Sequence, residues 1–374
     1  MQFRDLKQQY NVLKSEIDAA MTNVAASSAY IMGQPVKDLE RELAAFAGVR
    51  HCISCANGTD ALTIALKVWG ITAGDAVFVP DFTFFSSAEV VSAEGATPVF
   101  ADVDSRTFNL DPEKLEEVIV RTEKEGKLRP RAIVAVDLFG LPADYPAIRA
   151  LADRHGLLIL EDSAQGFGGA INGKRNGSFG DIATTSFFPA KPLGCYGDGG
   201  AIFTDNDEWA ALADSLRVHG KGSFKYDNVR IGMNSRLDTI QAAILQVKLK
   251  AFAGYELDKV NKAADLYTKI LEGHVVTPIV PEGFYSSWAQ YTIQLPSEEK
   301  RDSLQAHLRD KGIPSMIYYP KPMHGQTVYL PMGHTDDEFP VASRLCRTSL
   351  SLPMHPYITE EDIMEICAAV KSGI

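Results

Sequence analysis

Short apolar segments alternate with helical segments through the first half of the chain. Seven apolar segments have the length of a strand: Cys52–Ala56, Ala76–Pro80, Pro98–Val103, Ala132–Asp137, Leu157–Glu161, Ile182–Phe187 and Ala201–Thr204. Helices are expected between several of them, including Ala61–Trp69, Ser86–Glu94, Tyr145–His155 and Glu208–His219. This alternation is typical of a mostly parallel sheet with helices on both faces. We therefore expect an α/β core of about two hundred residues.

The pattern changes after Arg236. Residues from Leu237 to Glu272 are typical of a long helix that is interrupted near Gly254. Two strand-like segments and two helices follow: Tyr291–Leu295, Met316–Tyr319, Ser303–Lys311 and Glu360–Val370. We expect a large α/β domain over residues 1–250, which begins with a helical segment, and a smaller C-terminal α+β domain over residues 251–374.

The composition excludes several classes of partner. The 374 residues carry a formal net charge of -11, which argues against binding to nucleic acids or anionic membranes. The chain starts without the apolar core of a signal peptide, and no apolar run is long enough to span a bilayer, so we expect a cytoplasmic protein. No metal site is expected, because the Cys52 and Cys55 sulfurs would point to opposite faces of a strand and the histidines do not cluster.

Lys191 is the most informative single residue. It stands between the apolar run Phe187–Ala190 and the glycine-rich run Gly194–Gly200, whereas a lysine ammonium group normally stays on a solvated surface. Burial favours the neutral amine, and a neutral amine can form a Schiff base with an aldehyde. The sequence therefore suggests a cofactor that bonds to Lys191.

Two motifs supply what such a cofactor needs. The segment Asn57–Leu62 follows a strand and opens a helix, where backbone N–H groups bind anions, and we expect Asp60 to cap that helix. Asp162 directly follows the expected strand Leu157–Glu161, and its carboxylate could hold a pyridine nitrogen protonated. Gln165, three residues further on, could hydrogen-bond a phenolic oxygen.

Weaker candidates complete the set. Phe84 follows the strand that ends at Pro80 and could stack on a flat ring, and Ser186 is a candidate phosphate ligand. Taken singly, these residues have ordinary structural explanations as caps or core side chains, but together and in this order they describe a pyridoxal-phosphate site. Gly168–Lys174 looks like a P-loop, but Arg175 replaces the hydroxyl that would bind Mg²⁺, so we expect a hairpin there.

The same motifs carry a resemblance that covers essentially the whole chain. Asn57–Leu62, Glu161–Gln165, Ser186–Lys191 and Asn234–Asp238 resemble the DegT-type sugar aminotransferases. The resemblance implies a fold-type-I architecture like that of aspartate aminotransferase, in a homodimer with shared active sites. It implies pyridoxal 5'-phosphate as cofactor, held as a covalent internal aldimine on Lys191. It also implies a nucleotide-sugar substrate, glutamate as amino donor and 2-oxoglutarate as product.

The resemblance also assigns a role to each candidate. The catalytic residues would be Lys191 and Asp162. The other cofactor-binding residues would be Gly58, Thr59, Phe84, Gln165, Ser186 and, contributed across the subunit interface, Asn234. The residues that line the sugar pocket would be Tyr30, Arg236, Tyr318 and Tyr319.

Within this family the chain resembles enzymes that aminate carbon 3 of UDP-2-acetamido-3-oxo-glucuronate for surface-glycan or amino-sugar biosynthesis. Tyr318 stands where those enzymes carry His, and Ala190 stands where they carry Ser. Three alternatives for the substrate therefore stay open: amination at carbon 4, a sugar without the carboxylate, and a sugar linked to dTDP. The alternatives are a pyridoxal-phosphate-binding regulatory or sensor protein without turnover, and a sugar dehydratase, although dehydratases of this family replace the lysine by histidine. A nucleotide-sugar oxidoreductase would need a nicotinamide site that the sequence does not suggest.

Overall fold

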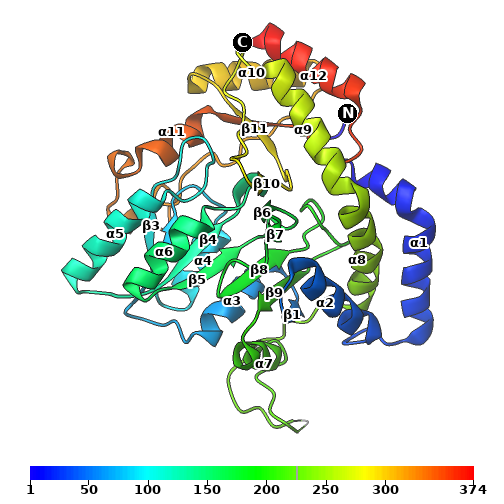
Figure 1. Ribbon diagram of the computed structural model, residues 1–374, viewed down its shortest axis with the longest axis vertical. Helices are drawn as coiled ribbons and strands as arrows, with labels where there is room; N and C mark the ends of the chain where they lie inside the picture. Colours follow the sequence, from blue (N-terminus) through cyan, green and yellow to red (C-terminus); the bar gives the residue numbers. More distant parts are fainter. Residues whose placement is uncertain (225) are drawn as a thin grey trace.

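A seven-stranded sheet forms the centre of the larger part of the computed structural model, which describes residues 1–224 and 226–374 (Figure 1). The strands, in spatial order, are β1 (His51–Cys55), β9 (Gly200–Thr204), β8 (Ile182–Ser186), β5 (Leu158–Asp162), β4 (Arg129–Val136), β2 (Asp75–Pro80) and β3 (Thr97–Ala101). The strands from β8 to β3 run parallel, whereas β9 is antiparallel to both of its neighbours. All seven predicted strands and the mostly parallel sheet are confirmed.

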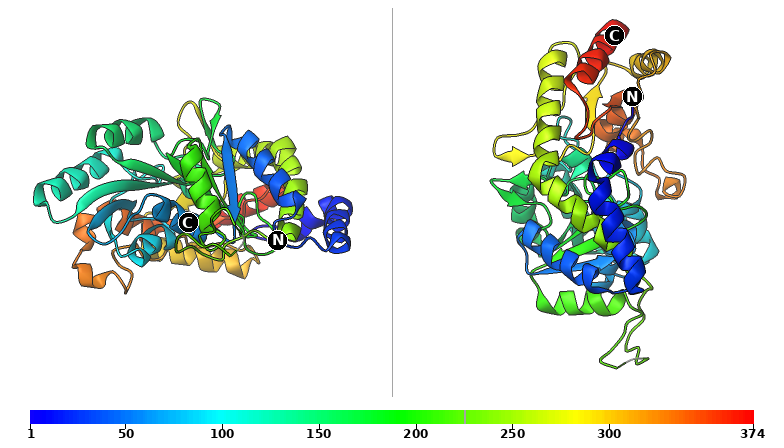
Figure 2. Two further views of the ribbon diagram at one scale, coloured as in Figure 1. Left: turned by 90° about the horizontal axis from the view of Figure 1, so that it is seen from below. Right: turned by 90° about the vertical axis from the view of Figure 1, so that its right-hand side faces the viewer.

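Helices cover both faces of this sheet (Figure 2). They are α2 (Gln34–Ala47), α3 (Gly58–Val68), α4 (Ser86–Ala93), α5 (Pro112–Glu125), α6 (Tyr145–His155) and α7 (Asp207–Leu216). Because side chains alternate along a strand, Val77 and Val79 of β2 pack with α3 and α4, whereas Phe78 packs with α5 and α6. Each such buried side chain contributes about 1.5–3 kcal/mol, so both faces stabilise the sheet.

The predicted long helix runs from the sheet into a second apolar core (Figure 1). It consists of α8 (Thr239–Ala251), a π-helical turn at Phe252–Glu256 and α9 (Leu257–Leu271), so the interruption expected near Gly254 is confirmed. The second core also contains α10 (Glu298–Asp310), α12 (Glu360–Gly373), and the antiparallel pair β11 (Tyr291–Gln294) and β12 (Ser349–Leu352).

The C-terminal half departs from the sequence prediction in two places. The expected strand at Met316–Tyr319 is wrong, because only Met316 forms a single bridge, with Ser351. Pro314 and Pro320 flank this segment and cannot donate to a ladder. In addition, α11 (Pro340–Thr348) and residues such as Met323 join the core of the large sheet rather than the second core. The expected domain boundary at residue 250 stays a prediction.

Three peripheral elements complete the fold. The hairpin expected near Gly168–Lys174 is confirmed as β6 (Ala170–Ile171) and β7 (Lys174–Arg175), which pairs with the short β10 (Phe284–Tyr285). Helix α1 (Leu6–Ser27) packs along α8. Within the described ranges, no helix has the length and apolar character needed to cross a membrane.

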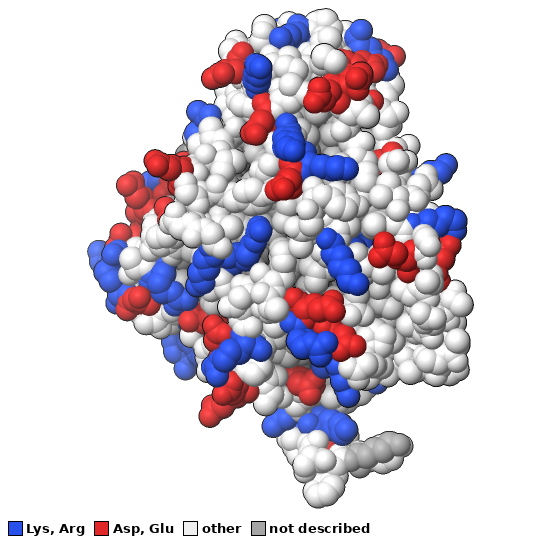
Figure 3. All heavy atoms as spheres, turned by 45° about the vertical axis from the view of Figure 1, so that its right-hand side comes forward, with Lys and Arg blue, Asp and Glu red and all other residues white. Residues whose placement is uncertain are grey.

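The chain between α7 and α8 projects away from the body (Figures 1 and 2). Exposed apolar side chains lie on it, including Phe224 and Ile231. Lysine and arginine side chains gather where this projection meets the body, whereas acidic and basic groups are interspersed over the rest of the face in Figure 3. The projection therefore exposes apolar side chains next to a group of basic ones.

Candidate active site

A cavity of about 460 Å³ lies at the carboxyl ends of β1, β5 and β8. Ligands bind at this edge in open α/β sheets, because the loops after neighbouring parallel strands meet there. The cavity brings together nine of the twelve predicted site residues: Gly58, Thr59, Phe84, Asp162, Gln165, Ser186, Lys191, Tyr318 and Tyr319. The other three, Tyr30, Asn234 and Arg236, do not line it.

The start of α3 forms one end of the cavity. Asn57 caps this helix, since its Oδ1 accepts a hydrogen bond from Asp60 N–H at 2.8 Å. The expectation that Asp60 is the cap is therefore wrong, and Asp60 lies in the first turn instead. The helical ladder begins with Ala61 N–H on Asn57 C=O. The N–H groups of Gly58 and Thr59 thus have no partner within the helix and suit an anion.

Gly58 is required here because of a close approach. A Cβ at this position would lie 2.6 Å from the Cβ of Ser186 at the end of β8. The absence of a side chain lets the helix start and the Ser186 hydroxyl converge on one point. This cradle fits the phosphate group of the cofactor that the sequence predicts.

Asp162 lies at the end of β5 and is buried. Its Oδ2 accepts a hydrogen bond from Ser87 Oγ at 2.9 Å, and its Oδ1 accepts one from Ala164 N–H at 3.2 Å. Burial raises the pKa of Asp162, while these two hydrogen bonds and the nearby charge of Lys191 lower it. A protonated ring nitrogen would add a further favourable partner for the carboxylate.

Ser87 is a site residue that the sequence did not reveal. It lies fully buried in the first turn of α4, and its Oγ is also 3.1 Å from Thr83 Oγ1. The sequence offers no signal for this role, because serine at a helix start ordinarily acts as a cap. Ser87 orients the Asp162 carboxylate.

Lys191 follows β8, and its N–H donates to Phe188 C=O at 2.9 Å. Its side chain reaches the same cavity as Asp162. Burial lowers the pKa of Lys191, the Asp162 carboxylate opposes this, and the positive charge of Arg4 adds to it. A lysine in this environment can present the neutral amine that attacks an aldehyde.

Aromatic and amide groups form the remaining walls. Gln165 Nε2 donates to the Tyr319 hydroxyl at 2.9 Å, and Gln165 Oε1 accepts from Phe139 N–H at 3.0 Å. The Phe84 side chain is 50% exposed, and its ring centre lies 6.2 Å from that of Tyr319. An exposed ring face at the cavity mouth is suited to stacking on a flat cofactor. Phosphate cradle, carboxylate, amine and aromatic face together fit pyridoxal phosphate.

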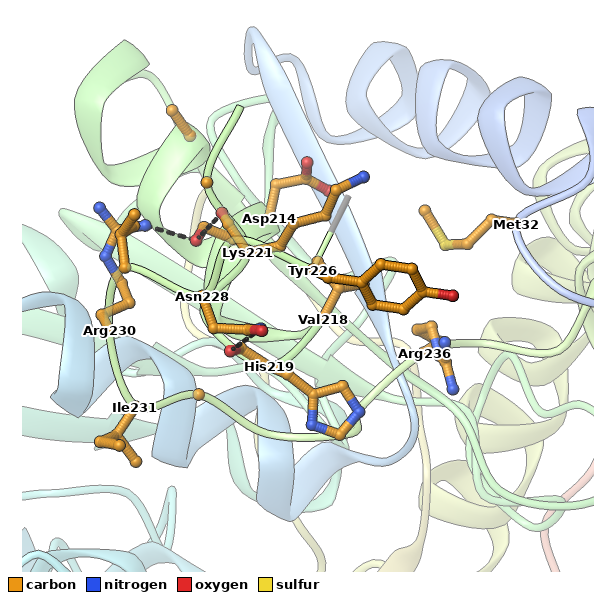
Figure 4. Close-up of a pocket in the computed structure, with 15 residues that line it drawn as sticks. Met32, Asp214, Val218, His219, Lys221, Tyr226, Asn228, Arg230, Ile231 and Arg236 are labelled. Atoms are coloured by element: carbon orange, nitrogen blue, oxygen red, sulfur yellow. Dashed lines mark hydrogen bonds between the residues drawn. The ribbon is translucent and has the colours of Figure 1, made fainter. Parts of the chain in front are cut away.

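The three remaining predicted residues lie near the projecting segment. Arg236 lines a second, wider cavity of about 1310 Å³, on the opposite side from Arg230 (Figure 4). The Arg236 guanidinium donates to Asn234 Oδ1 at 2.6 Å. Tyr30 is 53% exposed, and its carbonyl accepts from Thr239 N–H at 2.9 Å. The hydroxyl of Ser235, between Asn234 and Arg236, accepts from Ala56 N–H at 3.1 Å, so this segment passes beside the end of β1.

The chain is similar over essentially its whole length to known proteins. The model of the DegT/DnrJ/EryC1/StrS aminotransferase family matches residues 11–371. UDP-2-acetamido-2-deoxy-3-oxo-D-glucuronate aminotransferase of Pseudomonas aeruginosa is 42% identical over 99% of each chain. A pleiotropic regulatory protein of Geobacillus stearothermophilus is 45% identical over 96% of this chain and 94% of its own. The crystal structure of a DegT/DnrJ/EryC1/StrS aminotransferase from Brucella abortus is 48% identical, covers 100% of this chain and 99% of its own, and has a TM-score of 0.96.

Proposed function

The chain belongs to the DegT/DnrJ/EryC1/StrS aminotransferase family, and from that membership we propose that it transfers an amino group to a keto carbon of a nucleotide-linked sugar. It is a pyridoxal-phosphate-dependent transaminase with the fold-type-I architecture. One observation carries the proposal: Lys191, Asp162 and the start of α3 at Gly58 meet in one cavity.

Each residue of the cavity has a proposed task. When bound, pyridoxal phosphate supplies an electron sink for the carbon that gains or loses its proton. Lys191 Nζ takes that proton and returns it, as general base and then general acid. Asp162, oriented by Ser87, keeps the ring nitrogen protonated. The start of α3 and Ser186 hold the phosphate, Phe84 covers the ring, and Gln165 hydrogen-bonds the phenolic oxygen.

The proposed sugar substrate is a UDP-linked keto-sugar, with carbon 3 favoured as the site of amination. The support is the similarity to the Pseudomonas aeruginosa enzyme, whose name states a 3-oxo-glucuronate. Arg236 is the proposed contact for the substituent at carbon 6, and Tyr30, Tyr318 and Tyr319 are proposed to line the sugar pocket. Glutamate as amino donor and a cytoplasmic location stay predictions.

A half-reaction tests the chemistry. Glutamate is added to the cofactor-loaded protein, and we expect the visible absorbance of the lysine-bound cofactor to be replaced by the near-ultraviolet absorbance of the amine form. Lys191→Ala should abolish both the visible band and turnover. Lys174→Ala, an exposed lysine of the β6–β7 hairpin, is the matched control and should react as the wild type does.

The same assay distinguishes the transaminase from a second candidate function. The similarity to a protein named as a pleiotropic regulator favours a pyridoxal-phosphate-binding regulatory protein as the alternative. Such a protein would bind the cofactor but leave its absorbance unchanged when glutamate and other amino donors are added. That result, in a folded and loaded protein, would refute the transaminase assignment.

We also propose a homodimer in which Asn234 and Arg236 of each subunit complete the site that contains Lys191 of the other. Mixing inactive Lys191→Ala chains with inactive Arg236→Ala chains tests this, because every mixed dimer would hold one site without either substitution. With random exchange, about a quarter of the wild-type activity should return. No recovery in a mixture that forms mixed dimers would place both residues in the site of their own chain.

A further inference from the structure

Two cationic side chains lie behind the backbone of Lys191, on the side away from the cavity. The Arg4 guanidinium, just before α1, donates to the carbonyl of Lys191 at 2.8 Å and to that of Pro192 at 3.2 Å. The Lys248 ammonium, from α8, donates to the carbonyl of Gly194. Two cations from distant parts of the chain therefore hold three carbonyls within four residues.

Burying these cations costs free energy of folding, so their charge calls for an explanation. Lys248 is only 1% exposed, and the effective penalty for burying an ion is several kcal/mol. A neutral amide side chain could bind the same carbonyls without that penalty. Glu256 is the nearby buried carboxylate, and it accepts hydrogen bonds from Gln9 at 2.9 Å and from the Tyr357 hydroxyl at 2.6 Å. Burial lowers the pKa of Arg4 only to about 10, so its guanidinium stays charged at neutral pH.

The segment that carries Arg4 also reaches the sugar side of the cavity. The Phe3 ring packs edge-on against Tyr318, with ring centres 6.2 Å apart. The Phe3 carbonyl accepts a hydrogen bond from Met354 N–H at 3.2 Å, which ties this segment to the C-terminal part of the chain. Arg4 is therefore held in place from both sides and is not a loose terminal residue.

We propose that Arg4 and Lys248 are positioning residues for Lys191: both hold the backbone that carries it, and Arg4 also places positive charge behind its amine. The proposal rests on the proposed function, in which Lys191 bonds to the cofactor. Among the described residues, Asp162 across the cavity and Arg4 behind the backbone are the charged groups that act on Lys191, and Asp198 also lines the cavity. Asp162 favours the charged form of the lysine nitrogen, and Arg4 opposes it, so the amine can act as a base once it is released.

A pH titration of the holoenzyme tests the electrostatic part. The visible absorbance of the lysine-bound cofactor reports the pKa of the nitrogen that joins Lys191 to it. Arg4→Met should raise that pKa by about 0.5–1 unit, because a nearby cation no longer disfavours the protonated form. Arg4→Lys keeps the charge and should titrate close to the wild type. Lys7→Met, which removes an exposed lysine of α1, is the matched control and should not shift the pKa.

Lys248→Met provides an independent second variant. Lys248 acts through the carbonyl of Gly194, so Lys248→Met should leave the titration close to that of the wild type. For both methionine variants we expect kcat to fall several-fold with little change in the KM for glutamate. A structural role alone would lower the unfolding temperature without this fall in kcat and, for Arg4→Met, without moving the titration.

The outcomes distinguish a failure of the proposed function from a failure of the positioning role. A wild-type holoprotein without a visible band would refute the proposed function itself. If the wild type titrates but folded Arg4→Met titrates at the same pKa, the positioning role of Arg4 is overturned. Should Arg4→Met not fold, Arg4→Gln decides, because glutamine removes the charge but keeps an N–H donor for the two carbonyls; an unshifted pKa in that variant overturns the proposal.

Discussion

Replacing Gly58 by alanine would test where the cofactor phosphate binds. The new Cβ would lie 2.6 Å from the Cβ of Ser186 and 3.1 Å from its Oγ, whereas carbon atoms pack at about 3.5–4.0 Å. The start of α3 and the end of β8 would therefore have to separate by about 1 Å. Alanine within a helix is favoured over glycine by about 0.5–1 kcal/mol, so propensity and packing act in opposite directions on stability.

For cofactor binding, in contrast, Gly58→Ala has only an unfavourable effect. Displacing the helix start from Ser186 would cost at least one charge-assisted hydrogen bond to the phosphate, about 1.5–3 kcal/mol. This corresponds to cofactor binding that is weaker by about ten- to a hundredfold. Titration of the cofactor-free protein with pyridoxal phosphate, followed by visible absorbance, measures the affinity, and thermal unfolding of the same samples measures the stability.

Gly254→Ala is the matched control. Gly254 lies exposed in the π-helical turn, and an added Cβ there would meet nothing within 4 Å. We expect unchanged cofactor affinity and a slight gain in stability, because only the propensity effect operates. If Gly58→Ala binds the cofactor as tightly as the wild type does, the phosphate does not bind at the start of α3 and the assignment of Gly58, Thr59 and Ser186 is wrong.

Three further changes test other parts of the structure. Ser87→Ala removes a hydrogen bond to Asp162 and should raise the pKa of that carboxyl, so the acid limb of the pH–rate profile should move to higher pH; an unmoved limb would contradict the orienting role. Burial lowers the pKa of His355 to about 4 against about 6.5 in the unfolded chain. The wild-type free energy of unfolding should therefore fall as the pH drops from about 6.5 to 4, and His355→Gln should flatten this decline in acid denaturation. Arg217→Met leaves Glu40 without its buried partner and should lower the free energy of unfolding by about 3 kcal/mol in urea; a loss below about 1 kcal/mol would show that Glu40 is solvated.

Local patterns were sufficient where the interactions themselves are local. The seven strands of the main sheet and the interruption of the long helix near Gly254 follow from periodicity and composition over short windows. The same patterns place Asp162 at the end of one parallel strand and Lys191 in the loop after the next one in the sheet, and such positions meet at one edge of the sheet. The helix cap was assigned wrongly because both Asn57 and Asp60 favour that position, and only the backbone path shows that Asn57 occupies it.

Contacts between distant segments were beyond sequence reasoning. Ser87 and Asp162 are 75 residues apart, and Arg4 and Lys191 are 187 apart. No short window holds both partners of either pair. The strand expected at Met316–Tyr319 failed for a related reason: its residue types favour strands, but prolines on either side and the contacts of Tyr318 and Tyr319 in the cavity override that preference.

The sequence by itself determined the α/β class, the lysine that would bond the cofactor and the order of the groups around it. These depend on hydrophobic period and on residue chemistry, which are properties of short stretches of chain. Only the tertiary structure decided how Gly58 approaches Ser186, how Ser87 orients Asp162, and that buried cations lie behind Lys191. Those features depend on which remote segments pack together, since burial and hydrogen-bond geometry are set by the packing of the whole chain.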